Sequence, residues 1–361
     1  MRKQERQLFK NLCSFKAETF DESLLEAATP TVLGQLFFNR MQAIAYGTLK
    51  HHGLLNKVNR EFRNSLKSAY EQNLEKNKSF FTCVQYLNEI LADCNCKYPM
   101  LKGAYLCRCY PEGYRTSNDI DLLVLPNDVT KIGEALLNAG FQQGNIRNGV
   151  FTPATRKEII TSKMMRGETI PYIKEVNLPS MQFLEVDINF SLDYKPGDTT
   201  VLEEMLKRAS TWKIHGLNVT TLDDDDFLVH LCSHLYKEAT TLPWVEMKRD
   251  MTLYKYCDIY MLLEDVDREE IDGFFLRAKQ MGMEKVCAFA ILQTGALLHF
   301  SNTYAISAAS NILKDTPEFL HIIISPTNQK RYLYSEKDIA ERFFAEDRKL
   351  LLEEVNTYEK T

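Results

Sequence analysis

Ser117-Asn-Asp-Ile-Asp-Leu-Leu-Val124 decides the fold of this 361-residue chain. Large aliphatic and β-branched side chains fill residues 119–125, and Pro126 closes the run, which predicts a buried strand. Residues 129–139 have the spacing of a helix, and Gly140 suits the position just after its end. A strand followed directly by a helix favours an α/β core, which we expect to contain a mixed sheet.

A second strand is predicted farther along the chain. Phe183-Leu-Glu-Val-Asp-Ile-Asn-Phe190 alternates between apolar and polar residues, so Glu185, Asp187 and Asn189 share one face. Residues 212–221 have the pattern of a hairpin. Residues 145–180 are locally basic and give no clear pattern, and we interpret their charges as a solvated surface.

Helical patterns flank this core on both sides. Residues 1 to about 95 repeat apolar side chains at spacings of three and four. The aspartates at 223–226 suit a helix N-terminus, where the helix dipole favours negative charge. We therefore expect a helical region at 1–97, the α/β core at 98–221 and a helical domain at 222–361. Within that last domain we expect further helices at Lys248–Leu263, Glu269–Met281, Lys285–Leu298 and Lys337–Tyr358.

The composition restricts the class of protein. With 45% hydrophobic and 26% charged residues, the chain is typical of a soluble globular protein. A net charge of −5 gives no general attraction to DNA or RNA, so we expect no long nucleic-acid partner. The charged N-terminus precedes no apolar signal segment, and eighteen apolar residues nowhere run together, so we expect no membrane association.

The nine cysteines are odd in number and scattered, which indicates free thiols in a reducing cytoplasm. Cys94/Cys96 and Cys107/Cys109 form two C-x-C pairs that leave a zinc site open as an alternative. Structural zinc sites usually space their cysteines more widely, and the second pair falls in a predicted helix, so the free-thiol interpretation is favoured.

Asp119 and Asp121 are the residues that we predict to bind a metal ion. They are two residues apart on a strand, so both carboxylates project from one face, about 7 Å apart along it. Such a pair can bind hard cations, which prefer oxygen ligands. If the strand of Asp187 lies beside the first, three carboxylates converge; Glu185 is the alternative third acid. Isolated D-x-D motifs are common, but acids entering a buried strand normally need a partner or a metal.

These residues resemble a known family. Leu101-Lys-Gly-Ala104, then Arg115, then Ser117-Asn-Asp-Ile-Asp-Leu-Leu-Val124 is similar to the polymerase-β nucleotidyltransferase superfamily. More narrowly, the pattern resembles a bacterial family of uncharacterised nucleotidyltransferases with the signature L-K-G, an arginine and D-x-D-L-L-V. The resemblance covers most of the chain.

The resemblance implies a role for each matching residue. Lys102 and Gly103 stand where a glycine-rich loop receives phosphates. Arg115 would contact phosphate or orient Asp119, and Asp119, Asp121 and Asp187 match the metal triad. The remaining implied positions are nucleotide contacts at Ser117, Asn118 and His234, the last in a histidine-bearing helix with His230.

Two departures from the family pattern bear on activity. The usual Gly-Ser pair is Lys102-Gly103 here, so a serine contact to phosphate is missing. A histidine usual after the third acid is replaced by Asn189. The carboxylates nevertheless remain in place. His230 and His234 are one helical turn apart, which leaves metal binding, substrate contact and packing all open.

The predicted function is Mg²⁺-dependent transfer of a nucleoside monophosphate from an NTP to a hydroxyl-type acceptor, with release of pyrophosphate. Two metal ions about 3.5–4 Å apart can stabilise the attacking and leaving oxygens, and Mn²⁺ can replace Mg²⁺. Asp187 could also accept the proton of the acceptor hydroxyl. The acceptor, a small molecule, a peptide, a protein or a tRNA end, is not identified by the sequence. A decayed, non-catalytic binding module and, less favoured, a D-x-D glycosyltransferase are the alternatives.

Overall fold

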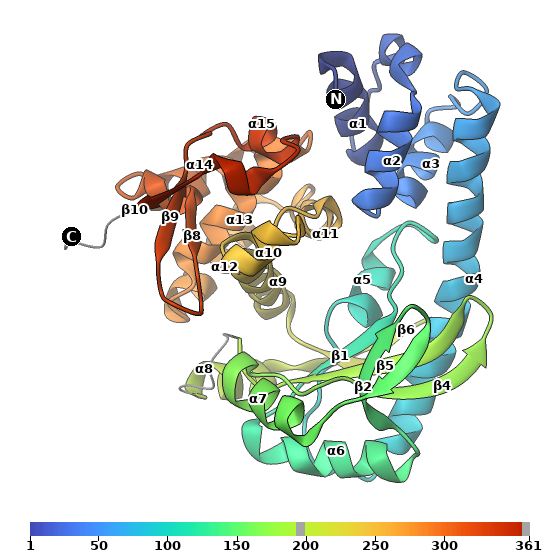
Figure 1. Ribbon diagram of the computed structural model, residues 1–361, viewed down its shortest axis with the longest axis vertical. Helices are drawn as coiled ribbons and strands as arrows, with labels where there is room; N and C mark the ends of the chain where they lie inside the picture. The colour runs from blue at the N-terminus through green and yellow to red at the C-terminus, as the bar shows by residue number, and fades with distance from the viewer. Residues whose placement is uncertain (193–198, 356–361) are drawn as a thin grey trace. The chain divides into compact units, whose positions relative to one another are not determined.

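The computed structural model describes residues 1–192 and 199–355, whose contacts group into two compact units (Figure 1). One unit comprises residues 71–227, and the other combines residues 1–70 with 228–361. Helices α4 (Arg60–Ile90) and α9 (Asp224–Ala239) each continue from one unit into the other. The three-part division expected from the sequence stays a prediction; by contacts, residues 71–97 group with the core.

A five-stranded mixed sheet forms the centre of the 71–227 unit. Its strand order is β1 (Asp119–Leu123), β5 (Met181–Asn189), β4 (Tyr172–Leu178), β2 (Gln142–Arg147) and β3 (Val150–Pro153). β1 and β5 are parallel, whereas the other neighbours are antiparallel. The predicted α/β core with a mixed sheet is confirmed. Residues 145–180, which gave no clear pattern, supply parts of β2, β3 and β4 and a helix.

Helices and a hairpin complete this unit. The predicted hairpin is confirmed as β6 (Ser210–Ile214) and β7 (Leu217–Thr221). The extended segment before the L-K-G motif lies beside β1, because the Leu101 amide donates to the Asp121 carbonyl at 2.8 Å. The helical segments are α5 (Gly103–Cys109), η2 (Pro126–Asp128), α6 (Val129–Asn138), α7 (Arg156–Arg166) and α8 (Thr200–Arg208).

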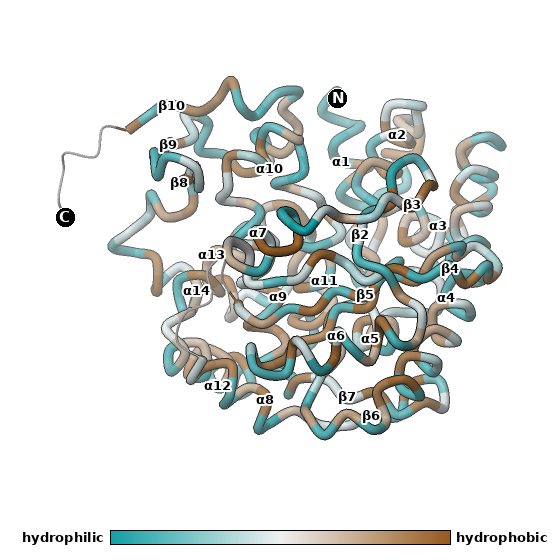
Figure 2. The backbone as a smooth tube through the Cα atoms, turned by 60° about the horizontal axis from the view of Figure 1, so that its bottom comes forward, coloured by the Kyte–Doolittle hydropathy of each residue, from teal (hydrophilic) through white to brown (hydrophobic). Residues whose placement is uncertain are grey.

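The sheet has one apolar and one acidic face where β1 and β5 meet. Ile120 and Leu122 of β1 and Val186 and Ile188 of β5 are all buried in one hydrophobic core. Residues of α4 and α6 belong to the same core, and α6 lies along one side of the sheet (Figure 1). Because side chains alternate along a strand, the acidic residues between these aliphatic ones lie on the opposite face. The alternation along β5 can be followed in Figure 2.

The other unit is mostly helical. Its N-terminal helical segments are α1 (Lys3–Cys13), η1 (Glu22–Ala27), α2 (Pro30–Phe38), α3 (Gln42–His51) and the start of α4. After α9 follow α10 (Leu242–Glu246), α11 (Leu253–Leu263), α12 (Arg268–Gln280), α13 (Glu284–Leu297), α14 (Thr303–Leu313), η3 (Pro317–Leu320), α15 (Ile339–Phe343) and η4 (Arg348–Leu351). The helices expected at 223, 248–263, 269–281 and 285–298 are thus present, with α11 beginning at Leu253. No helix among the described residues is long and apolar enough to span a bilayer.

The helix expected at Lys337–Tyr358 is wrong. Within the described residues, this segment forms the short helix α15, the 3₁₀ turn η4 and the strand β10 (Leu352–Val355). β10 pairs with β9 (Arg331–Tyr334), which also pairs with β8 (Ile322–Ile324). The tertiary pairing overrides the local helical preference of a charged segment. Residues 356–358 lie outside the described residues.

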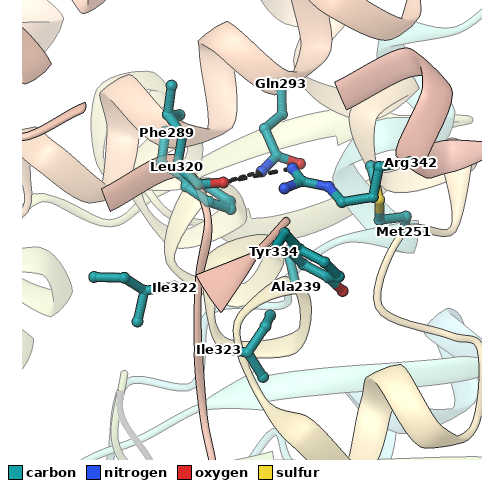
Figure 3. Close-up of a pocket in the computed structure, with 9 residues that line it drawn as sticks. All are labelled: Ala239, Met251, Phe289, Gln293, Leu320, Ile322, Ile323, Tyr334 and Arg342. Atoms are coloured by element: carbon teal, nitrogen blue, oxygen red, sulfur yellow. Dashed lines mark hydrogen bonds between the residues drawn. The ribbon is translucent and has the colours of Figure 1, made fainter. Parts of the chain in front are cut away.

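Buried arginines stabilise this unit. Arg348 makes an ion pair with Asp250 at 2.6 Å, and its Nε also donates to the same carboxylate. Arg342 is only 1% exposed, and one of its Nη atoms lies 3.2 Å from Nδ1 of His321. Figure 3 shows the Arg342 guanidinium directed at the Leu320 carbonyl, next to Gln293. Charged groups this deeply buried need such partners.

Candidate active site

The register of β1 and β5 brings four acids together. Asp119 pairs with Glu185 and Asp121 with Asp187 across the two parallel strands. Adjacent strands are about 4.8 Å apart, so the four side chains form two rows of two on one face. The condition for three converging carboxylates, that the two strands be neighbours, is therefore met. We call Asp119, Asp121, Glu185 and Asp187 the acidic ladder.

Lys102 supplies the positive charge of the site. Its Nζ donates to Oδ1 of Asp121 at 2.9 Å, while the lysine and aspartate side chains are 21% and 6% exposed. Its φ of +44° lies in the left-handed range that favours glycine, so a lysine here is strained. Lys102 thus occupies a glycine-like backbone position and directs its ammonium at the acidic ladder.

The pKa values of the three aspartates are shifted in different directions. Burial raises the pKa of Asp121, and Asp119 adds to this, although Lys102 opposes both effects. Burial also raises the pKa of Asp187 well above its usual range, with Asp121 and Asp119 contributing. Burial would raise the pKa of Asp119 too, but Lys102, a hydrogen bond from Ser117 and the charge of Arg115 together lower it. Without a further cation, Asp121 and Asp187 are therefore protonated more readily than an exposed aspartate, whereas Asp119 stays ionised to lower pH.

The loop before β1 places the remaining predicted residues near Asp119. The Ser117 hydroxyl donates to Oδ1 of Asp119 at 2.7 Å, and Ser117 is 7% exposed. Arg115 donates to the Thr116 carbonyl and acts on Asp119 through its charge. The Asn118 side chain accepts a hydrogen bond from Lys76 of α4. Arg115 thus acts on Asp119 through its charge, and both its orienting role and its contact with phosphate stay predictions.

Residues of α4 and of the segment before β4 were missed by the sequence analysis. Asn73 and Asn77 donate to the carbonyls of Gly113 and Arg115, each at 3.0 Å. Glu168 contributes to the raised pKa of Asp187. The polar residues at 73, 76 and 77 share one helix face, which is a signal in the sequence for these contacts, whereas the helix prediction rests on the apolar face alone.

The donors present suit a hard cation. Oδ2 of Asp121 is buried and has no hydrogen-bond partner, which is the state expected of a ligand oxygen. All four side chains of the acidic ladder offer oxygen, the donor that Mg²⁺ prefers. As the side chains stand, however, no three His, Cys, Asp or Glu residues in the described part of the chain are gathered closely enough to hold a metal. Lys102 takes Oδ1 of Asp121 and leaves Oδ2 to a metal, whose binding the nearby ammonium opposes by its charge.

His230 and His234 lie on α9 within the unit formed by 1–70 and 228–361. Their rings stack with centroids 6.4 Å apart. Nε2 of His234 lies 3.2 Å from a carboxylate oxygen of Glu238, which also pairs with Lys255 of α11. The contact of His234 with the nucleotide stays a prediction. The cysteines at 94, 96, 107 and 109 form no disulfide with one another, and the thiols of Cys107 and Cys109 donate to backbone carbonyls.

An acidic ladder on neighbouring strands of a mixed sheet, with a lysine among its carboxylates, defines a candidate site for a divalent cation and the phosphates it accompanies. The chain belongs to the family described as uncharacterised nucleotidyltransferase, whose model matches residues 27–299. Membership supports a general nucleotidyltransferase role. The matched range includes every residue assigned above to the candidate site.

Two further comparisons add little to this assignment. One solved structure similar to this chain is that of an antigenic nucleotidyltransferase-like protein from Paracoccidioides brasiliensis. The two chains are 14% identical with a TM-score of 0.32, over 65% of this chain and 88% of that one. At that score the likeness assigns no role to any residue here. A comparison with curated proteins gives no match.

Proposed function

We propose that the protein transfers a nucleoside monophosphate from an NTP to a hydroxyl-type acceptor, using Mg²⁺ held by Asp119, Asp121 and Asp187. The observation that carries the proposal is the pairing of Asp121 with Asp187 and of Asp119 with Glu185 on one face of neighbouring strands. The unpartnered Oδ2 of Asp121 supports a ligand role for that residue. Membership in a nucleotidyltransferase family supports the class of reaction.

The bound metal would supply Lewis-acid stabilisation of the charge that develops on the phosphate oxygens. The chain's own residues do the rest. Lys102 leaves Asp121 and places its ammonium against the triphosphate, for which a compact point charge is suited. Arg115 helps to keep Asp119 ionised, since its charge lowers the pKa of that carboxyl together with Lys102 and the Ser117 hydrogen bond. Asp187 accepts the proton of the attacking hydroxyl, a role compatible with its raised pKa.

Calorimetric titration with each of the four NTPs in the presence of Mg²⁺ tests the proposal. We expect one or more NTPs to bind the wild type and none to bind Asp119→Ala/Asp121→Ala. Binding that selects a nucleotide then justifies an acceptor screen by pyrophosphate release. Equal binding by the double variant, shown to be folded by circular dichroism, would refute the proposed site.

Glu185→Gln and Asp187→Asn identify the third acid. Both acids face the same side of β5, and Asp187 lies opposite Asp121 while Glu185 lies opposite Asp119. If Asp187 is the third ligand, Asp187→Asn abolishes metal-dependent NTP binding and Glu185→Gln leaves most of it. The reverse result would transfer the assignment to Glu185.

A non-catalytic binding module is the second candidate function. The observation that favours it is the Lys102–Asp121 ion pair, which neutralises a ligand carboxylate without any metal. Under this alternative, NTPs bind equally well with and without Mg²⁺, and no acceptor yields pyrophosphate. Mg²⁺-dependent binding followed by turnover would exclude it.

A further inference from the structure

Ser117 and Gly103 compete for one small volume. A Cβ atom built on Gly103 would lie 2.4 Å from Cβ and 2.7 Å from Oγ of Ser117. Both distances are far shorter than van der Waals contact, so the serine side chain fills the space that a side chain at position 103 would need. Only one of these two positions can therefore carry a side chain.

The loop is fixed where this close approach occurs. Asn77 of α4 donates to the Arg115 carbonyl at 3.0 Å, and Asn73 donates to the Gly113 carbonyl at 3.0 Å. The Cys107 thiol of α5 also donates to the Arg115 carbonyl at 3.6 Å. Two helices thus hold the backbone two residues before Ser117, which restricts how far the serine can move away from Gly103.

The Ser117 hydroxyl acts on one oxygen of Asp119. It donates to Oδ1 at 2.7 Å from a position that is 7% exposed. A carboxylate with one oxygen held by a buried donor keeps a defined orientation and presents its other oxygen in a fixed direction. Groups that orient a metal ligand in this way commonly change metal affinity when they are removed.

We propose that Ser117 is a positioning residue that orients Asp119 for metal binding, and that it does so from the space that glycine at position 103 leaves open. The inference rests on the proposed function, because it assigns Asp119 to the metal. Glycine at position 103 leaves the space that the Ser117 side chain occupies.

Exchanging the two residues tests the inference. The variants are Ser117→Ala, which removes the hydroxyl, Gly103→Ser/Ser117→Gly, which returns it from position 103, and the matched control Gly103→Ala/Ser117→Gly, which fills the space without a hydroxyl. Mn²⁺ affinity is measured by electron paramagnetic resonance, with thermal unfolding in parallel. We expect about tenfold weaker Mn²⁺ binding by Ser117→Ala and by the control. The exchanged variant should return to within about threefold of the wild type, because its hydroxyl can again reach Asp119.

Each other outcome overturns the inference in a recognisable way. Wild-type affinity in Ser117→Ala would show that the hydroxyl does not orient the ligand. An exchanged variant as weak as its alanine control, with both equally stable, would show that a hydroxyl from position 103 cannot substitute. If the wild type binds no Mn²⁺ with or without NTP, the proposed function fails and this inference fails with it. Wild-type binding with unchanged variants overturns this inference alone.

Discussion

Lys102→Met should lower the free energy of unfolding of the metal-free protein and raise its affinity for a divalent cation. The substitution removes the ammonium that donates to Asp121 at 2.9 Å and keeps most of the aliphatic chain. Asp121, Asp119 and Asp187 together raise the pKa of Lys102 against the opposing effect of burial, so the lysine is fully charged at neutral pH. The variant therefore removes the ammonium that is hydrogen-bonded to the acidic ladder.

The expected loss of stability follows from the burial of the Lys102–Asp121 ion pair. Breaking a buried ion pair by removing one partner costs about 3–5 kcal/mol, and the 21% exposure of the lysine side chain favours the lower end. For a unit of this size, about 3 kcal/mol corresponds to a fall in Tm of roughly 6–12 °C. The ammonium also repels a cation bound at the other oxygen of Asp121, so removing it should strengthen metal binding. We expect Mn²⁺ affinity to rise by about tenfold or more.

The assay is thermal unfolding in chelator and in rising Mn²⁺, at a pH well above the usual carboxyl range. Lys102→Met should unfold earlier than the wild type in chelator and gain more stability from Mn²⁺. Affinity for Mn²⁺–NTP should rise less than affinity for Mn²⁺ alone, because the triphosphate loses its lysine contact. Lys97→Met is the matched control: Lys97 donates to the Leu206 and Lys207 carbonyls and to no residue of the acidic ladder, and its loss should leave metal affinity unchanged.

An unchanged or weaker Mn²⁺ affinity in a folded Lys102→Met variant would refute the reasoning. Lys102 would then support the ligands rather than compete with the metal. If the methionine variant does not fold, Lys102→Gln tests the same competition with a polar side chain that can still donate to Asp121.

Two predictions concern the rest of the molecule. Asp250→Asn should lower the free energy of unfolding by about 3 kcal/mol, because Arg348 would lose its buried, charged partner. Denaturant unfolding measures this loss, and a metal titration should show unchanged Mn²⁺ affinity. A loss of Mn²⁺ affinity along with the loss of stability would contradict the prediction. Burial, aided by the charges of Arg342 and Lys337, lowers the pKa of His321 to about 4 from 6.5. The unfolded chain then binds more protons between these values, so this contribution is present above pH 6.5 and is lost as the pH falls toward 4. The loss in the free energy of unfolding should be about 2 kcal/mol, after allowing for the partial exposure of His321. If the stability of the wild type and that of a His321→Gln variant change equally with pH, the prediction is refuted.

The acidic face could be predicted because it depends on local alternation. On β5 the period of two separates Glu185 and Asp187 from buried aliphatic residues, and at the start of β1 the buried Ile120 lies between Asp119 and Asp121. The register that places Asp121 opposite Asp187 joins residues far apart in the sequence, and no local pattern encodes it.

Other features of the site depend on the tertiary structure alone. The positive φ of Lys102 and its ion pair across nineteen positions to Asp121 have no signal in a single sequence. The strand β2 reads Gln-Gln-Gly-Asn-Ile-Arg, which lacks the apolar alternation of a half-buried strand. The charges of segment 337–355 fit a solvated helix, but β10 is formed by pairing with β9, which no local pattern of the segment predicts.

Mn²⁺ binding in the presence of NTP, measured on Asp121→Asn, Asp187→Asn and Glu175→Gln, tests the metal site most directly. Glu175 is an exposed acid on the neighbouring strand β4, so its variant loses a carboxylate of the same sheet outside the acidic ladder. We predict that Asp121→Asn and Asp187→Asn lose at least about tenfold in affinity while Glu175→Gln binds as the wild type does. Unchanged binding in both aspartate variants, with all proteins folded, would contradict a metal site on β1 and β5.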